Sequence, residues 1–308
     1  MSRDATAGPG SFPLDAAPLL SRSTVDRREG LRDTPDGGAE MWTSGRMLLV
    51  DARGRTPIDA ESRLDLQPAV DFGDGPAPHS VLLGVQDGTS YWAMRTEHDG
   101  AQDGWINLRS GGALLSDTDA GLLTTAVGLL GWHDNARYCA ICGAATVPVR
   151  TGWARTCTGC DREEYPRTDP AVICLIHDGA DHVLLARQPV WPPDRYSVIA
   201  GFVEVGESLE ACVEREALEE VGVPVTDVRY LGSQPWPFPR SLMLGFAATA
   251  DRDAAITPAD GEIEDARWVH RDVVLAALDS EGDAVDGLRL PPSVSIAHRM
   301  IRGWAIWK

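Results

Sequence analysis

The segment GFVEVGESLEACVEREALEEVGV, residues 201–223, constrains the fold more than any other part of this 308-residue chain. Ser208 is a favourable N-cap residue, because its hydroxyl can accept a hydrogen bond from the first helical turn. Gly222 suits the left-handed position that follows the end of a helix. The sequence therefore predicts a helix over 208–221 that carries most of the seven glutamates of this segment.

One edge of this predicted helix combines apolar and acidic side chains. At about 100° per residue, one narrow stripe contains Leu209, Val213, Glu216 and Glu220, with Cys212 and Glu219 at its flank. Carboxylates that are partly buried together repel one another and lose hydration, at a cost of roughly several kcal/mol unless a cation compensates. A solvated helix with internal ion pairs is disfavoured, since Arg215 is the one basic residue of the segment. Mg²⁺ or Mn²⁺, which prefer oxygen ligands and retain waters, would account for the stripe.

Four of the six cysteines form two CxxC pairs with 14 residues between them. They are Cys139 and Cys142 in CAIC, and Cys157 and Cys160 in CTGC. Four thiolates at this spacing predict one tetrahedral Zn²⁺, and two disulfides or a redox motif are weaker alternatives in a reducing compartment. Because four protein ligands leave no open position, this zinc is expected to be structural. Cys174 and Cys212 are expected to be small buried hydrophobes.

The composition limits the compartment and the partners. The net charge is −18, from 46 acidic and 28 basic residues, so the surface repels a phosphate backbone unless a metal or a local basic site intervenes. The N-terminus lacks a signal-peptide pattern, and no window has the roughly 20 apolar residues of a membrane span. These features predict a cytoplasmic protein with no membrane partner and with reduced thiols.

Three parts of the chain are predicted. Residues 1–130 form an N-terminal α/β domain, whose first ~40 residues have a composition typical of a partly mobile segment. Residues 131–168 form the zinc ribbon and a connector, and 169–308 form a second α/β domain. Strands are predicted at 46–54, 80–95 with an Asp-Gly turn, 171–176, 182–187, 196–205, 228–233, 242–250 and 266–272, and helices at 118–132, 208–221 and 293–306.

The segment 201–223 resembles the Nudix box, Gx5Ex7REUxEExGU, in which U is a bulky aliphatic residue. The matching positions are Gly201, Glu207, Arg215, Glu216, Glu219, Glu220, Gly222 and Val223, and Ala217 is smaller than usual for U. The chain is thereby identified as a member of the Nudix hydrolases, which cleave a nucleoside diphosphate linked to another moiety. The resemblance implies an α/β/α sandwich around a mixed sheet.

A second stretch, SQPWPFPRSLMLGF at 233–246, resembles the SQPWPFPxS signature of bacterial NADH pyrophosphatases, which also act as NAD-capped RNA hydrolases. Three prolines in five residues make a stiff loop, and Trp236 and Phe238 give it aromatic faces that suit a planar base. A proline-rich turn with core aromatics is the alternative. With the cysteines, the box and this loop in the family's order, the resemblance covers at least 132–308.

The resemblance implies a role for each of several residues. Glu216, Glu220, Glu262 and the carbonyl of Ala200 would bind Mg²⁺ or Mn²⁺, with Glu264 as the alternative to Glu262. Glu219 completes the acidic cluster, and Glu219 or Glu220 would be the general base. Arg215 is expected to pair with Glu207 and to fix the helix and its preceding loop. The residues implied in substrate binding are Tyr165, Phe202, Gln234, Pro235, Trp236, Pro237, Phe238, Pro239, Arg240, Ser241 and Ala297. Tyr165 and Phe202 are the candidates to stack on nicotinamide, although a core position is the alternative for Phe202.

The implied activity is metal-assisted hydrolysis of the pyrophosphate of NADH or NAD⁺ to nicotinamide mononucleotide and AMP. Removal of NAD caps from RNA is a second implied activity, for which arginines around the zinc segment could hold the single strand: Arg137, Arg150, Arg155, Arg162 and Arg167. A homodimer is also implied. The alternative is a non-catalytic nucleotide-sensing or nucleic-acid-binding regulator, which would have lost a glutamate of the box, and none is missing.

Overall fold

The computed structural model describes residues 12–34, 36–97, 104–258, 261–280 and 282–307. Its contacts divide the chain into two compact units. Unit 1 contains 12–18, 169–234 and 241–307, and unit 2 contains 19–168 and 235–240. The predicted mobility of the first ~40 residues concerns in part residues 1–11 and 35, which lie outside the described residues. Further along, the side chains of Phe12 and Leu20 are buried.

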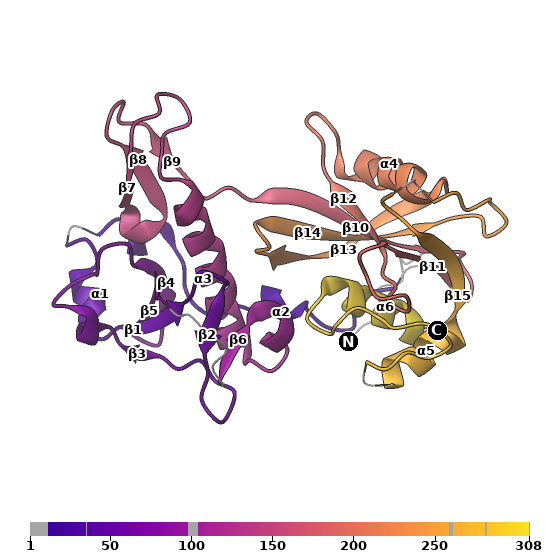
Figure 1. Ribbon diagram of the computed structural model, residues 1–308, viewed down its shortest axis with the longest axis horizontal. Helices are drawn as coiled ribbons and strands as arrows, with labels where there is room; N and C mark the ends of the chain where they lie inside the picture. Colours follow the sequence, from indigo (N-terminus) through magenta and orange to yellow (C-terminus); the bar gives the residue numbers. More distant parts are fainter. Residues whose placement is uncertain (1–11, 35, 98–103, 259–260, 281, 308) are drawn as a thin grey trace. The chain divides into compact units, whose positions relative to one another are not determined.

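Unit 1 is built on a six-stranded sheet with helices on both faces (Figure 1). Its strands are β10 (Asp169–His177), β11 (His182–Arg187), β12 (Ile199–Phe202), β13 (Thr226–Trp236), β14 (Ser241–Thr249) and β15 (Asp265–His270). Its helices are α4 (Leu209–Val221), α5 (Arg271–Asp279) and α6 (Ile296–Ile306). The sheet order is β13-β14-β10-β11-β15, and β12 pairs with β10. Because β10 runs parallel to β14 and antiparallel to β11 and β12, the sheet is mixed, as predicted.

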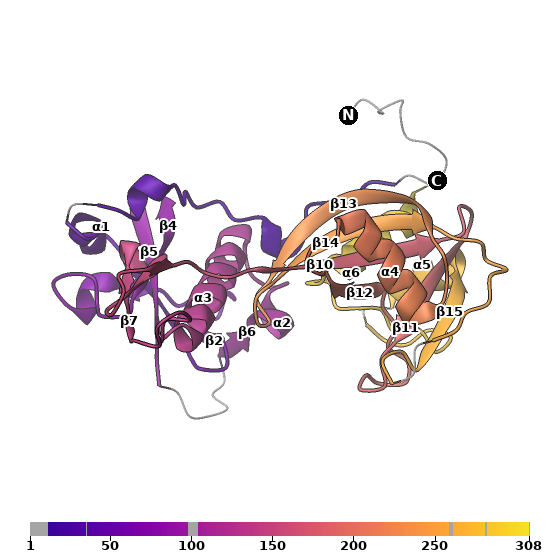
Figure 2. The ribbon, with the colours of Figure 1, turned by 90° about the horizontal axis from the view of Figure 1, so that it is seen from above.

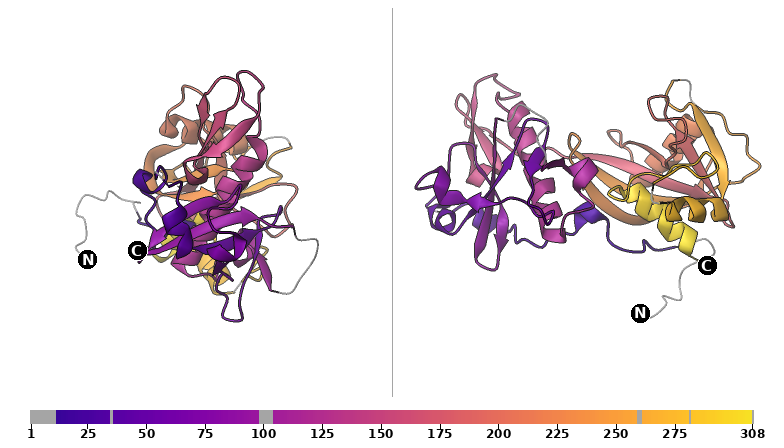
Figure 3. Two further views of the ribbon diagram at one scale, coloured as in Figure 1. Left: turned by 90° about the vertical axis from the view of Figure 1, so that its left-hand side faces the viewer. Right: turned by 60° about the horizontal axis from the view of Figure 1, so that its bottom comes forward.

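The central strand β10 separates two hydrophobic cores. Since successive side chains of a strand point to opposite faces, Cys174 and Ile176 join the core that includes α4, whereas Ile173 and Leu175 join the core that includes α6. Figure 2 shows α4 lying across one face of the sheet, and the right-hand view of Figure 3 shows α5 and α6 on the other. This arrangement is the α/β/α sandwich that the resemblance implied.

Unit 2 contains a smaller α/β domain followed by the ribbon. The domain comprises α1 (Ala39–Thr43), β1 (Arg46–Val50), β2 (Arg55–Pro57), β3 (Gln67–Pro68), β4 (Val81–Gln86), β5 (Thr89–Arg95), β6 (Trp105–Asn107), α2 (Leu108–Gly111) and α3 (Asp117–Asn135). Strands β3, β1, β5 and β4 form one sheet, and α3 packs against it. Trp42 and Trp92 meet edge to face in the core, with their ring centroids 5.2 Å apart.

The ribbon is a three-stranded sheet of β7 (Thr146–Val149), β8 (Ala154–Cys157) and β9 (Glu163–Glu164). Four short 3₁₀ helices complete the regular structure of the described residues: Leu19–Ser21, Glu29–Leu31, Ala69–Phe72 and Arg150–Gly152. No helix in the described part of the chain combines the length and the apolar character that a membrane crossing requires.

Several predicted elements differ in extent from the observed ones, among them 46–54, of which only Arg46–Val50 forms β1, and 293–306, of which α6 takes Ile296–Ile306. The segment 196–205 is predicted as one strand, but only Ile199–Phe202 forms β12. The segment 266–272 is predicted to be entirely strand, whereas β15 ends at His270 and α5 begins at Arg271. The imidazole of His270 accepts a hydrogen bond from the Asp272 amide, and this N-cap converts the strand into a helix.

Candidate active site and zinc centre

Helix α4 begins and ends where the sequence predicts. The Ser208 hydroxyl accepts a hydrogen bond from the Ala211 amide at 3.2 Å. Gly222 adopts the left-handed conformation, with a φ of 70°, and its amide donates to the carbonyl of Leu218. These two caps set the rotation of the helix, and therefore which glutamates face the sheet.

The carboxylate stripe faces the sheet. Glu216 and Glu220 are 9% and 3% exposed and share the inward side of α4 with Val213, whereas Glu210 and Glu214 are exposed. Leu209 and Val213, the apolar half of the stripe, pack in the hydrophobic core beneath α4. The second part therefore places two carboxylates at the edge of that core.

Gly201 on β12 leaves the room that one of these carboxylates occupies. A Cβ at this position would lie 1.9 Å from both Cδ and Oε1 of Glu216, well inside any real contact distance. The backbone amide of the neighbouring Ala200 donates a hydrogen bond to Glu220, which only partly opposes the rise that burial causes in the pKa of this carboxyl. Strand β12 thus brings both carboxylates of the stripe to one short stretch of backbone.

The electrostatics of the stripe favour a bound cation. Burial, reinforced by the charges of Glu216 and Glu262, raises the pKa of Glu220 to about 8. Burial also raises the pKa of Glu216, although hydrogen bonding and charge from Arg215 oppose the shift. The charge of Glu262 makes ionisation of both Glu216 and Glu220 harder, so a divalent ion with oxygen ligands would be favoured beside these two carboxylates. The residues present fit Mg²⁺ or Mn²⁺.

Arg215 fixes the acidic cluster by several hydrogen bonds. Its Nε and Nη2 donate to the two oxygens of Glu207 at 2.8 and 2.9 Å, so the pairing predicted from the sequence is bidentate. Its Nη1 donates to Glu216 and Glu219, both at 2.9 Å, and its Nη2 donates to the carbonyl of Phe202 at 3.0 Å. Hydrogen bonding from Arg215 lowers the pKa of Glu207 to about 2. One guanidinium therefore joins the loop, α4 and β12.

The two candidate general bases lie in different environments. Glu219 is exposed and accepts a hydrogen bond from Arg215. Glu220 is almost fully buried beside Ala200. Solvent therefore reaches Glu219 directly, whereas the Glu220 carboxylate is shielded from solvent.

The residues of unit 1 that are predicted to bind substrate differ in their exposure. Phe202 is 59% exposed, so the alternative that it lies in the core is wrong. Gln234 and Ala297 are buried, and Ser241 is nearly so. The Gln234 amide donates to the carbonyl of Val294 at 3.0 Å, which ties β13 to the segment before α6.

The aromatic loop and Tyr165 belong to unit 2. Trp236 and Phe238 meet edge to face with their ring centroids 5.0 Å apart, and the Arg109 guanidinium lies 4.3 Å from the Phe238 ring centroid. Tyr165 is 58% exposed, and its hydroxyl donates to Glu163 at 2.6 Å. Pro235 is exposed near the end of β13, and in the connection to β14 Pro237 is buried while Pro239 and Arg240 are exposed. Sequence reasoning missed Arg109, because it lies about 130 residues before the loop that it contacts and no local pattern connects the two.

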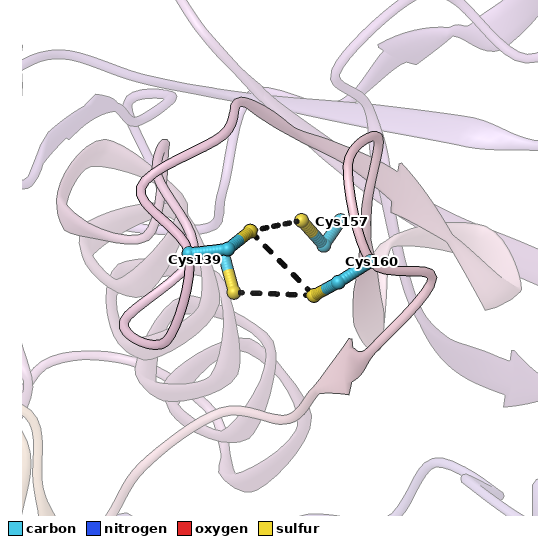
Figure 4. Close-up of side chains that lie close together, drawn as sticks. Cys139, Cys157 and Cys160 are labelled. Carbon is cyan, nitrogen blue, oxygen red and sulfur yellow. Dashed lines mark hydrogen bonds between the residues drawn. The ribbon is translucent and has the colours of Figure 1, made fainter.

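The four predicted zinc ligands converge in the ribbon. Three Sγ–Sγ separations are 3.3, 3.6 and 3.8 Å, and all four sulfurs lie within 4.8 Å of one another. Figure 4 shows the Sγ atoms of Cys139, Cys157 and Cys160 directed toward a common point. A tetrahedron with Zn–S bonds of about 2.3 Å has edges of about 3.8 Å, so these residues fit Zn²⁺. Amides of Ile141 and Gly159 donate to Cys139 and Cys157, which favours thiolates.

A second group of potential metal ligands directly follows the C-terminal end of β10. Asp178, Asp181 and His182 come together in the β10–β11 turn. Asp178 accepts hydrogen bonds from the amides of Ala180 and His182, and Asp181 contacts the His182 ring at 2.6 Å. These bonds close the hairpin, and they belong to a turn distinct from the carboxylate stripe of α4.

The sandwich, the buried carboxylates and the four-thiol cluster together define a zinc-ribbon Nudix hydrolase. Known families match three successive parts of the chain: an NADH pyrophosphatase-like rudimentary NUDIX domain at 40–132, an NADH pyrophosphatase zinc ribbon domain at 134–165, and a NUDIX domain at 167–286. The first match relates the N-terminal α/β domain to a rudimentary form of the domain that the C-terminal part matches.

Similar proteins identify the family within this class of hydrolases. The chain is 48% identical to the NAD-capped RNA hydrolase NudC of Mycobacterium bovis over 303 residues, which is 96% of both chains. It is 47% identical to NudC of Mycobacterium tuberculosis over the same share. It is also 40% identical to the human NAD-capped RNA hydrolase NUDT12 over 199 residues, which is 62% of this chain and 42% of the human protein. The chain belongs to the NudC family of Nudix hydrolases.

Proposed function

We propose that this Nudix enzyme hydrolyses the pyrophosphate bond of NADH and NAD⁺ to nicotinamide mononucleotide and AMP, and that it removes NAD caps from RNA 5′ ends. The observation that carries the proposal is the burial of Glu216 and Glu220 against β12, with Glu216 beside Gly201, at the edge of an apolar core. Two carboxylates in such a place are costly unless they hold a cation. The relation to NAD-capped RNA hydrolases over 96% of the chain supports the choice of substrate.

The residues of the chain have separate tasks in this reaction. Glu216, Glu220 and Glu262, with the carbonyl of Ala200, would hold Mg²⁺ or Mn²⁺. The ion, when bound, supplies charge neutralisation at the phosphate oxygens and lowers the pKa of water. Arg215 holds Glu207, Glu216 and Glu219 in fixed relative positions through its hydrogen bonds. Glu219 or Glu220 accepts the proton of the attacking water.

Substrate recognition would use exposed aromatic faces. Phe202 and Tyr165 expose large parts of their rings, as a stacking partner of nicotinamide must. We assign direct contact to the exposed members of the predicted set, and we assign Gln234 to support of the segment before α6. Its full burial and its hydrogen bond to Val294 support that assignment.

The experiment that tests the proposal compares two isosteric substitutions on the same helix. Glu220→Gln removes one charge from the buried stripe and should lower kcat on NADH by about 100-fold or more. Glu214→Gln removes one charge from the exposed face of α4 and should leave kcat unchanged. AMP release with Mg²⁺ or Mn²⁺ is the measurement. Near wild-type turnover of the first variant would refute the assignment.

A further substitution separates the two candidate bases. Glu219→Gln should lower kcat while leaving the affinity for Mn²⁺ nearly unchanged if Glu219 accepts the proton. Glu220→Gln should weaken Mn²⁺ binding as well, because it removes a ligand. If Glu219→Gln turns over like the wild type, the proton goes to Glu220.

We also propose a cytoplasmic homodimer. Six free cysteines, four of them arranged as metal ligands, support a reducing compartment. Exposed apolar side chains on unit 1, among them Val205, Leu218 and Tyr230, support an interface between copies. Sedimentation equilibrium of the zinc-loaded protein tests the stoichiometry, and a monomer at micromolar concentration would exclude the dimer.

A further inference from the structure

Arg187 is a buried cation of unit 1, and none of the predicted roles in metal or substrate binding falls on it. It is the last residue of β11, and it is only 9% exposed. A guanidinium stays charged in proteins, so its burial is costly unless a carboxylate pairs with it. The partner of Arg187 therefore shows which part of the chain this buried charge holds in place.

That partner is Glu264, which Arg187 contacts through both the main chain and the side chain. The Glu264 amide donates to the Arg187 carbonyl at 2.8 Å, and Nη2 of Arg187 lies 2.7 Å from Oε2 of Glu264. The antiparallel register of β11 and β15 places Arg187 opposite Asp265. Glu264 is thus the residue just before β15, and the ion pair fixes the point at which the chain enters this strand.

The chain around Glu264 is held from both faces of the sheet. On one face, Ile263 is 6% exposed and packs in the hydrophobic core beneath α4. On the other face, Tyr196 belongs to the core that includes α6, and its hydroxyl donates to Asp265. Glu262 is exposed, but it directly precedes these three anchored residues. Its main chain is therefore fixed on the C-terminal side.

Glu262 and Glu264 differ in what surrounds their charges. Burial, and after it charges that include that of Glu262, raise the pKa of Glu216 and of Glu220. The charge of Glu264 is instead compensated by Arg187. Because the Arg187 charge would repel an ion bound to Glu264, the ion pair favours Glu262 over Glu264 as the third acidic ligand.

We propose that Arg187 is a positioning residue for the metal site. Through its ion pair with Glu264 it fixes the chain that carries Glu262. Glu262 then meets the ion together with Glu216 and Glu220. This proposal rests on the proposed function, since it assumes the ion that these three glutamates would hold. Arg187 touches neither the ion nor the substrate in this account, so its loss should weaken metal binding although every ligand is still present.

The test measures Mn²⁺ affinity of the zinc-loaded protein by electron paramagnetic resonance titration, with NADH hydrolysis against Mn²⁺ concentration as a second readout. Arg187→Met and Glu264→Ala should each weaken Mn²⁺ binding by about tenfold. The double variant should also lose about tenfold rather than about a hundredfold, because both changes remove the same interaction. Arg187→Lys keeps a charge that can pair with Glu264 and should recover most of the affinity. The matched control Arg302→Gln breaks another ion pair of unit 1, with Asp15 at 2.8 Å, and should leave both readouts unchanged.

Several results would overturn the proposal. If Arg187→Met weakens Mn²⁺ binding while Glu264→Ala does not, Arg187 does not act through Glu264. Additive losses in the double variant would lead to the same conclusion. If Glu264→Ala abolishes binding and Glu262→Gln leaves it intact, Glu264 is the ligand and the assignment is reversed.

Two features of the design keep its outcomes separate. Zinc content and the thermal transition show whether each variant folds, and if Arg187→Met does not, the comparison of Arg187→Lys with Glu264→Ala decides, because Glu264 has a side chain that is 49% exposed. The resonance titration needs no turnover. A wild-type enzyme that binds Mn²⁺ but fails to cleave NADH would therefore refute the proposed function, and this is a different result from failure of the Arg187 proposal.

Discussion

Replacement of Gly201 by alanine tests the geometry of the active site without removing any ligand. The added Cβ would lie 1.9 Å from Cδ and Oε1 and 2.3 Å from Oε2 of Glu216. An ordinary van der Waals contact needs about 3.5 Å. The Glu216 carboxylate or the β12 backbone must therefore move by more than about 1 Å, and every other interaction of the stripe remains available.

A displacement of this size has a predictable effect on the rate. Misplacement of a reacting or positioning group by about 1 Å can cost about 100-fold. That factor corresponds to about 2.7 kcal/mol of lost transition-state stabilisation. We therefore expect Gly201→Ala to lower kcat/KM on NADH by about 100-fold and to weaken Mn²⁺ binding, measured by activity against metal concentration and by direct metal titration.

The matched control is Gly30→Ala, at a glycine whose added Cβ would meet no atom within 4 Å. This variant should retain the wild-type rate, and both variants should retain one zinc ion per chain and a cooperative thermal transition. If Gly201→Ala hydrolyses NADH at the wild-type rate with wild-type metal affinity, then Glu216 does not occupy this position in the working enzyme, and our account of the stripe is wrong.

Three further predictions concern the metal sites. Arg215→Lys should lower kcat/KM by about 10- to 100-fold, because one ammonium nitrogen cannot occupy the separate positions from which the guanidinium nitrogens donate to Glu207, Glu216 and Glu219; kinetics on NADH provide the measurement. Cys142→Ser should lose bound zinc and lower the thermal midpoint, whereas Cys174→Ala should keep its zinc; a colorimetric zinc assay separates them. Without added metal, stability should fall as pH rises from about 5 to about 8, because folded Glu220, with its pKa raised to about 8, keeps a proton that the unfolded chain releases near the ordinary glutamate pKa of 4.5. The thermal midpoint of the wild type should fall across this range relative to that of Glu220→Gln, because a glutamine does not titrate. A difference between the two midpoints that stays constant with pH would contradict the buried environment assigned to Glu220.

Local signals in the sequence predicted α4 and its inward face. Ser208, Gly222 and the spacing of the glutamates all act within one helix, so helical periodicity alone identifies the side that faces the sheet. The convergence of the four thiols was predictable for the same reason, because two CxxC pairs restrict them to a small space whatever surrounds them. The structure confirms the helix with its two caps and the cluster of four cysteines.

Features that depend on distant segments were not predictable in the same way. The room beside Glu216 depends on the pairing of β12 with β10, which places Gly201 opposite Val172. The contact of Arg109 with Phe238 joins segments with no local relation in the sequence. The start of α5 was missed because alternating residues of β15 run directly into it, and the one signal was the capping side chain of His270.

The net charge of −18 is a weak argument against RNA binding, because in salt solution a charge acts only over a short distance. At physiological ionic strength the screening length is about 8 Å, so exposed charges farther from a phosphate than this contribute little to its energy. The charges that decide binding are therefore those that lie beside the phosphates. An acidic surface therefore disfavours adsorption of RNA over most of the protein while permitting it where arginines are locally in excess.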